Sequence, residues 1–291
     1  MGLQITHICD QGRLAMNLED AKKAFRSQPK SEVYFAEAQF GYDKIHPQIK
    51  TLLLGARVLE VGAGSGILLS TLASEFPGLN FTGLEPMGDG FQYEDTFHKL
   101  INEFPNAHLH PTGYEAMPDT QKFDLIYLVN VFEHLPDWQD FLKFVRTILS
   151  PTGTCIVLCP NYSFPYEPHF QIPIVFTKKI THALLGKTIK KFEKTNDCAG
   201  LWKSLNFVKL SKVKHRARML NLNVGLNKTI LREMVSRLDS DPVFAKRQGV
   251  LRTPIFILKK TGLMSFLFTS KITERFIPYM HLSFSHSSPN P

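Results

Sequence analysis

The stretch VLEVGAGSG, residues 58–66, leads from a mostly apolar run into three alternating glycines. Glycine has no Cβ, so backbone amides at these positions can approach a ligand closely. The leucine-rich segment that follows is expected to form a helix, and its N-terminus would direct partial positive charge to the same place. A strand, a glycine loop and a helix in this order predict a binding site for a nucleotide-like ligand.

The spacing of the glycines argues against a dinucleotide such as NAD. Dinucleotide sites use G-x-G-x-x-G, whose third glycine lets the helix pack closely on the strand. Here Gly62, Gly64 and Gly66 form G-x-G-x-G, and the bulky Ile67 takes the place of the third dinucleotide glycine. Glu60, two positions before the first glycine, would repel a pyrophosphate. It could instead accept a hydrogen bond from a cationic amino-acid group.

Short apolar runs alternate with longer amphipathic ones from Arg57 onward, which is the pattern of parallel strands separated by helices. We therefore predict an α/β, Rossmann-like fold with a mostly parallel, seven-stranded sheet flanked by helices. The predicted strands are 57–61, 79–84, 107–111, 123–129, 154–159, 206–213 and 279–286. The predicted helices are 66–75, 89–103, 137–149 and 172–185, with further helical pieces in 1–54 and 226–277.

The composition, 291 residues of which 43% are hydrophobic, suits one large domain with a cap. The four cysteines, Cys9, Cys155, Cys159 and Cys198, have no regular spacing and are expected to be reduced thiols. Cys155 and Cys159 have no histidine at a useful spacing, so no metal site is predicted. Because no signal pattern and no run of about 18 apolar residues occurs, we expect a soluble, cytoplasmic protein.

Charge is distributed unevenly along the chain. Residues 1–159 hold 12 basic and 19 acidic groups, whereas residues 160–291 hold 22 and 7. The basic part is expected to face a phosphate or carboxylate, a membrane surface or nucleic acid, or to be a solvated surface. RNA is disfavoured because few aromatics interleave with the charges of 208–220 and no nucleic-acid module is recognised. Residues 253–280, which mix apolar and basic side chains, predict a helical cap or an interfacial helix on anionic lipid.

Five segments, in order, resemble the motifs of the class I S-adenosylmethionine-dependent methyltransferases. VLEVGAGSG resembles the first motif, and FTGLEP, residues 81–86, ends the second strand with an acidic residue. The other matching segments are PTGYEAMP at 111–118, FDLIYLVNVFEHLPDW at 123–138 and SPTGTCIVLCPN at 150–161. The five lie, in order, within residues 57–161, which make up about a third of the chain.

The resemblance implies S-adenosylmethionine as the cofactor and assigns roles to residues. Glu85 would hold both ribose hydroxyls, since a carboxylate accepts two donors at once. Tyr114 and Glu115 would border the adenine, and Asn130 and Val131 would lie near the methionine end. The cofactor-binding residues that we predict are Glu60, Gly62, Ala63, Gly64, Gly66, Glu85, Pro86, Tyr114, Glu115, Asn130 and Val131.

The acceptor side must come from other residues, because methyl transfer is an in-line displacement that needs position, exclusion of water and sometimes a base. Glu133-His134 resembles the Glu-His pair of ubiquinone-pathway O-methyltransferases, and His134 is either a base or a brace for the following helix. In CPNYSFPYEPHF, residues 159–170, prolines stiffen a loop that carries Tyr166, Glu167 and His169. His169 could be the base and Glu167 its orienting partner; a purely structural loop is the alternative.

The sequence thus predicts a helical N-terminal lid over 1–54 and an S-adenosylmethionine-binding core over 55–160. Residues 161–291 would supply an acceptor-side insertion, the remaining core strands and a helical cap. The predicted activity is methyl transfer to a hydroxyl, carboxyl or amine of a small or lipid-like, anionic acceptor. The alternatives are an inactive cofactor-binding partner subunit and an RNA methyltransferase.

Overall fold

A computed structural model gives the fold of the chain. It describes residues 31–86, 104–249 and 276–287, with short pieces at 8–9, 13–14, 18–19, 22, 255–257 and 260–261. The chain divides into two compact units. The first consists of residues 1–129 and 144–156, and the second of residues 130–143 and 157–291.

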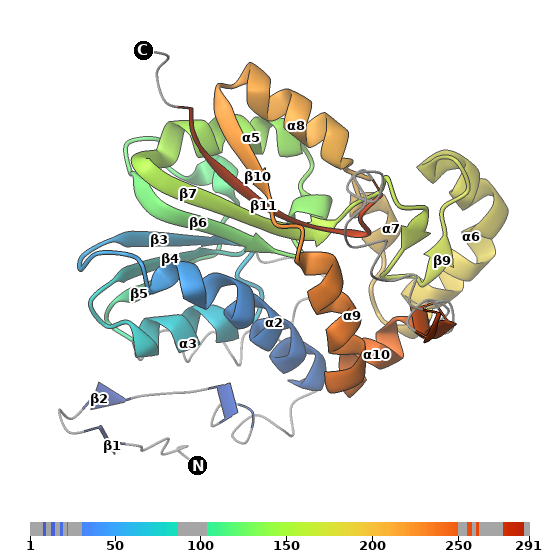
Figure 1. The fold of residues 1–291 in the computed structure, drawn as a ribbon, viewed down its shortest axis with the longest axis horizontal. Helices are drawn as coiled ribbons and strands as arrows, with labels where there is room; N and C mark the ends of the chain where they lie inside the picture. The colour runs from blue at the N-terminus through green and yellow to red at the C-terminus, as the bar shows by residue number, and fades with distance from the viewer. Residues whose placement is uncertain are drawn as a thin grey trace. The chain divides into compact units, whose positions relative to one another are not determined.

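Seven strands form one mixed sheet in the order β10-β11-β7-β6-β3-β4-β5 (Figure 1). Their bounds are Arg57–Val61 (β3), Asn80–Leu84 (β4), Ala107–His110 (β5), Phe123–Val129 (β6), Leu149–Pro160 (β7), Leu222–Leu226 (β10) and Tyr279–His286 (β11). Strand β3 pairs in parallel with β4 and β6, and β4 with β5, whereas β10 and β11 are antiparallel. The predicted Rossmann-like α/β fold with seven strands flanked by helices is confirmed.

In the first unit, β3 lies between two parallel neighbours, and four of its five residues are buried. Strands that are covered on both faces appear in a sequence as continuous apolar runs, as this one does. Helices α2 (Ser31–Ile49) and α3 (Ile67–Glu75) pack against each other, and α3 also packs on β4 (Figure 1). Gly41 permits the close approach of the two helices, because a Cβ there would lie 2.6 Å from the Leu68 side chain.

In the second unit, short elements follow β7. Strands β8 (Tyr166–Glu167) and β9 (Ile172–Pro173) form a two-stranded antiparallel sheet. The helices are α6 (Lys178–Thr195), α7 (Leu201–Ser204), α8 (Leu210–Met219), α9 (Ile230–Ser240) and α10 (Pro242–Arg247). Helix α8 packs on β10, and α9 packs on β11.

The remaining elements are β1 (Ile8–Cys9), β2 (Arg13–Leu14), α5 (Trp138–Ile148) and the 3-10 turns Tyr114–Ala116 and Phe132–His134.

The predicted strand at 206–213 is wrong, because helix α8 begins at Leu210. Its buried residues, Leu210, Val213 and Ala217, have the three- and four-residue spacing of one helix face. The helix expected at 172–185 begins later, at Lys178, because β9 occupies residues 172–173 and Thr177 caps the helix by accepting from the Ile180 amide.

Some predictions lie outside the described residues. They are the helix at 89–103 and most of the cap at 253–280. Within the described ranges, no helix is both long and apolar enough to cross a membrane.

Candidate active site

The glycine loop has a backbone shape that requires glycine. Gly62, Gly64 and Gly66 have φ angles of +74°, +52° and +71°, in the left-handed region that side chains with a Cβ rarely adopt. The amides of Gly62 and Ala63 donate hydrogen bonds to the Leu84 carbonyl at 2.8 and 3.0 Å. The loop after β3 is therefore fastened to the end of β4.

Glu85 follows β4 directly and turns toward this loop. Its Oε2 accepts a 2.7 Å hydrogen bond from the Gly64 amide, and the residue is 8% exposed. Burial raises the pKa of the Glu85 carboxyl, although the Gly64 hydrogen bond lowers it in part. The predicted ribose-binding carboxylate and the predicted glycine loop therefore lie in direct contact.

Glu60 is held inside the sheet of the first unit. It is 4% exposed, and its Oε2 accepts a 3.1 Å hydrogen bond from the Tyr127 hydroxyl. Burial raises the pKa of Glu60 well above its usual range, and the charge of Glu85 adds to this, whereas the Tyr127 hydrogen bond lowers it. Sequence reasoning missed Tyr127, which stands beside Glu60 because the two residues are register partners of β3 and β6.

The predicted adenine border lies near the 3-10 turn that starts at Tyr114. The Tyr114 side chain is buried, and its ring centroid lies 5.3 Å from that of Phe144. Glu115 is exposed, and both its carboxylate and the Pro86 ring lie beside Gly113. Pro86 and Glu115 therefore flank one glycine, whereas the Tyr114 ring packs into the unit.

Asn130 marks the exit of β6. Its φ angle is +56°, which asparagine tolerates better than most residues. Its amide donates to the Leu158 carbonyl at 2.8 Å, and its Oδ1 accepts a 2.6 Å hydrogen bond from the Tyr279 hydroxyl. Val131 then leads into the turn that contains Glu133 and His134. Tyr279 was missed because 149 residues separate it from Asn130.

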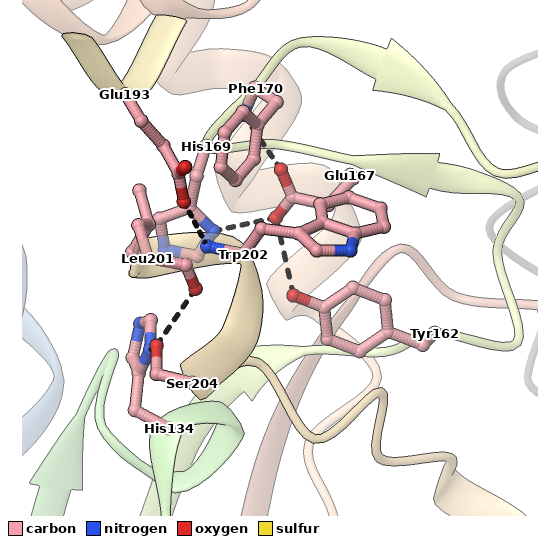
Figure 2. Close-up of polar contacts among 9 residues, drawn as sticks. All are labelled: His134, Tyr162, Glu167, His169, Phe170, Glu193, Leu201, Trp202 and Ser204. Atoms are coloured by element: carbon pink, nitrogen blue, oxygen red, sulfur yellow. Dashed lines mark hydrogen bonds and ion pairs between the residues drawn. The ribbon is translucent and has the colours of Figure 1, made fainter. Parts of the chain in front are cut away.

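Glu167 is the centre of a polar cluster in the second unit (Figure 2). The residue is fully buried, and its carboxylate accepts from His169 Nδ1 at 2.6 Å, the Phe170 amide at 2.7 Å and the Tyr162 hydroxyl at 3.2 Å. The rings of Phe170 and Trp202, with centroids 5.5 Å apart, pack edge to face beside it. The structure therefore brings His169 and Glu167, which the sequence predicts as a pair, into contact.

His134 lies against the same cluster. Its Nδ1 is 2.9 Å from Ser204 Oγ, and its ring centroid is 5.1 Å from that of His169 (Figure 2). The pKa of His134 is lowered to about 3, mainly by burial and further by the charge of His169. The imidazole of His134 is therefore neutral at physiological pH.

Two further predicted groups have clear placements. The Tyr166 hydroxyl is buried and has no hydrogen-bond partner in the part of the chain that the structure describes. Burial, followed by the charge of Glu167, raises the pKa of Tyr166. Cys155 and Cys159 are fully buried thiols whose pKa values are raised, chiefly by burial.

Comparison with known proteins adds the family. Residues 34–209 match the family model of a methyltransferase domain. The uncharacterized protein Rv1509 of Mycobacterium tuberculosis is 34% identical over 217 residues, which cover 74% of this chain and 73% of that protein. The chain belongs to this methyltransferase family. The sequence-based prediction of a class I S-adenosylmethionine-dependent methyltransferase is confirmed in family and fold.

Two other proteins resemble parts of the methyltransferase. The tRNA U34 carboxymethyltransferase of Pseudoalteromonas translucida is 33% identical over 117 residues, which cover 40% of this chain and 35% of that one. The solved structure of PKMT2 from Rickettsia typhi superposes with a TM-score of 0.51 at 15% identity, covering 82% of this chain and 50% of that one. The second likeness concerns the fold alone.

The methyltransferase thus carries two groups of polar residues, one in each compact unit. In the first unit, Glu85 contacts Gly64, and Glu60 contacts Tyr127. In the second unit, Glu167 binds His169. His134 meets this pair through its ring, although 35 positions separate His134 from His169. Tyr162 and Ser204, which no sequence pattern indicated, complete the second group.

Proposed function

We propose that this methyltransferase transfers the methyl group of S-adenosylmethionine to a hydroxyl, carboxyl or amine of a small or lipid-like, anionic acceptor. The observation that carries the cofactor part of the proposal is the hydrogen bond from the Gly64 amide to Glu85. This hydrogen bond links the glycine loop with a buried carboxylate. The loop would present only its backbone to the cofactor, and the carboxylate can accept hydrogen bonds from ribose hydroxyls.

The charge of the first unit suits this cofactor. Glu60 and Glu85 are both buried, and the pKa values of both are raised, so their ionised forms are stabilised by a cation. S-adenosylmethionine, when bound, supplies a methyl group on a positively charged sulfur that is open to in-line attack. Gly62, Ala63 and Gly66 would allow close backbone approach to it.

The other predicted contacts complete the proposed cofactor site. Pro86 and Glu115 beside Gly113 would border the adenine, with Tyr114 behind them. Asn130 and Val131 would lie along the methionine end, and the Tyr279 hydrogen bond would keep Asn130 in its left-handed conformation. These roles are proposals that follow from the family resemblance and from the positions at the carboxyl ends of β3, β4 and β6.

For the acceptor, we propose binding at the Glu167 cluster. Glu167 fixes the ring of His169 through Nδ1, and we propose that this imidazole takes the proton of an acceptor hydroxyl, carboxyl or amine. Glu167 itself is a positioning residue. The buried Tyr166 hydroxyl, raised in pKa and therefore protonated, is available as a donor to an acceptor oxygen. His134, whose imidazole is neutral, would lie beside the same acceptor.

The basic second half supports an anionic or lipid-like acceptor and a peripheral contact with an anionic membrane surface. Phe176, which lies just before α6, is 86% exposed, and Ile180 and Leu184 on α6 are 43% and 64% exposed. Exposed apolar side chains of this size beside basic ones are typical of interfacial helices. The exposed lysines of α6 are Lys179, Lys187, Lys190, Lys191 and Lys194.

RNA methylation is the second candidate, favoured by the likeness to a tRNA-modifying relative over 40% of the chain. That likeness is limited to part of either protein. If RNA were the acceptor, retention of the protein on RNA would fall steeply with salt. Indifference to RNA at low salt would remove this candidate.

The proposal is tested in two steps. Calorimetric titration with S-adenosylmethionine should show saturable binding. Incubation with fractionated lipid and metabolite extracts should then release S-adenosylhomocysteine with at least one fraction. Binding without product on any fraction would favour the inactive partner subunit, and absence of binding would contradict the proposal.

A further inference from the structure

We propose that Glu133, His134 and His169 bind a divalent transition-metal ion. One ligand atom from each of these residues lies within 4.8 Å of the other two. Ligand atoms of a tetrahedral, zinc-type ion stand about 2.0–2.2 Å from it, so two of them are about 3.3–3.6 Å apart. Side-chain rotations that bring these atoms about 1 Å closer together would close the three ligands around one ion.

The hydrogen bonds of His134 identify the nitrogen that would bind the ion. Ser204 Oγ donates its one hydrogen to the Leu201 carbonyl at 2.8 Å. The same oxygen lies 2.9 Å from His134 Nδ1, so it can only accept there, and Nδ1 carries the proton (Figure 2). The neutral His134 ring then has its lone pair on Nε2, as a metal ligand requires.

His169 is prepared in the same way by a carboxylate. Its Nδ1 donates to Glu167, which is fixed in turn by the Tyr162 hydroxyl and the Phe170 amide. In the neutral ring, the lone pair again lies on Nε2. A carboxylate that holds the far nitrogen of a histidine is the usual second partner of a metal-binding imidazole, because it sets the tautomer and the ring orientation.

Glu133 supplies the negative charge. Its side chain is fully buried, and a buried carboxylate is costly unless a cation compensates it. The backbone that carries Glu133 and His134 is also held in place: Asn206 donates from its amide to the Glu133 carbonyl at 2.8 Å and from Nδ2 to the Phe132 carbonyl at 2.7 Å. Two of the three ligands therefore stand on a fixed turn.

Two imidazoles and one carboxylate suit Zn²⁺, Fe²⁺ or Co²⁺ better than Mg²⁺ or Ca²⁺, which prefer oxygen ligands. Three protein ligands leave open positions for water or for an acceptor oxygen, whose proton the ion would make more acidic. The inference deepens the proposed function and rests on it for this role, because the ion would hold the acceptor atom otherwise given to His169. It also departs from the sequence-based expectation of no metal site, which considered the cysteines.

The experiment is a titration of the chelator-treated, full-length protein with Co²⁺ and with Zn²⁺ alone, followed by visible absorption and by calorimetry. We expect saturable binding of a single ion per chain, with Co²⁺ absorption bands typical of nitrogen and oxygen ligands. Glu133→Gln and His169→Ala should abolish this binding. Glu167→Gln should weaken it about 10- to 100-fold, as loss of a second-sphere partner does.

The matched control is His215→Ala, which removes an exposed histidine of α8 in the same compact unit and should leave the affinity unchanged. Circular dichroism checks that each variant is folded. If His169→Ala fails to fold, Ser204→Ala carries the test, because it removes only the partner of His134 Nδ1 and should still weaken binding.

Absence of saturable binding, binding that survives His169→Ala, an unchanged affinity in Ser204→Ala, or an equal loss in His215→Ala would each overturn the metal proposal. These titrations contain neither S-adenosylmethionine nor acceptor, so their failure would leave the proposed methyl transfer untouched. Conversely, failure of cofactor binding in the wild-type protein would leave the metal result standing.

Discussion

The amide of Gly64 donates a 2.7 Å hydrogen bond to the carboxylate of Glu85. The two residues follow neighbouring parallel strands, β3 and β4, and 21 positions separate them. The contact requires Gly64 to hold a φ angle of +52° and Glu85 to be almost fully buried. Glycine adopts this φ angle without strain, whereas burial of the Glu85 carboxyl costs stability.

Gly64→Val is expected to abolish binding of S-adenosylmethionine, because the new side chain would occupy the ligand side of the loop and strain the backbone. Titration calorimetry measures the effect. The control is Gly55→Val, since Gly55 has a φ angle of +81° but nothing within 4 Å of its Cβ position. Both variants should lose stability, but only Gly64→Val should lose the cofactor. Wild-type affinity in Gly64→Val would show that the loop has another role.

Glu85→Gln is expected to change affinity and stability in opposite directions. Loss of a charged acceptor for the ribose should weaken cofactor binding by about 1–3 kcal/mol. The pKa of Glu85 is raised in the folded protein, so this carboxyl favours folding at acid pH, and the benefit is lost as the pH rises through the folded pKa. The cofactor-free variant should therefore have a higher Tm than the wild type at mildly alkaline pH, with the difference disappearing in acid. A lower Tm at alkaline pH would contradict this explanation.

Tyr127→Phe is expected to lower the free energy of unfolding by about 1–3 kcal/mol in urea, because it removes the hydroxyl donor of the buried Glu60. Tyr42→Phe is the matched comparison. Its hydroxyl donates to Glu75 in an exposed setting, where water can replace it, so its effect should be smaller. Equal losses in the two variants would mean that burial of Glu60 contributes nothing.

His169→Gln is expected to lower the turnover number about 10²- to 10⁴-fold once an acceptor is in hand, the usual range for loss of a group that handles the acceptor proton. Cofactor affinity should not change, because His169 is held by Glu167 in the proposed acceptor cluster and is not among the proposed cofactor-binding residues. The measurement is S-adenosylhomocysteine release beside calorimetry on the same sample. A change in cofactor affinity with an unchanged turnover number would show that His169 does not belong to the acceptor site.

Phe176→Ser combined with Leu184→Ser is expected to reduce sedimentation of the protein with vesicles that contain anionic phosphatidylglycerol. Binding of the wild type should also fall with added salt, since the lysines of α6 supply part of the attraction. Leu53→Ser with Leu54→Ser is the control pair, because these leucines are 83% and 88% exposed in the other unit. A similar reduction of vesicle binding in both double variants would show that exposed apolar residues anywhere on the protein contribute to the binding.

The sequence predicted the strands that are buried on both faces well, because such strands appear as short apolar runs bounded by turn residues. The predicted bounds of β3 and β6 agree with the structure. Helix α8 was mistaken for a strand because Val208 and Leu210 alternate with the polar Lys209 and Ser211 before the helical spacing of Val213 and Ala217 becomes apparent. Strand β10, with the sequence LNVGL, was missed because asparagine and glycine disfavour strands.

The same distinction between local patterns and tertiary contacts applies to the residues of the candidate site. Glu85 and the glycine loop could be predicted because each is a local motif, and Glu167 with His169 because two positions separate them. The contact of Tyr127 with Glu60 depends on the register between two strands. The contact of Tyr279 with Asn130 depends on how strand β11 pairs in the sheet. The meeting of His134 with His169 depends on how the loop after β7 folds back. No local pattern contains that information.

The most direct test of the central claim is a crystal structure of the protein with S-adenosylhomocysteine. The account predicts both ribose hydroxyls within hydrogen-bonding distance of the Glu85 carboxylate, and the nucleoside against the backbone of Gly62 to Gly66. A ribose bound elsewhere, with Glu85 still turned to Gly64 alone, would contradict it.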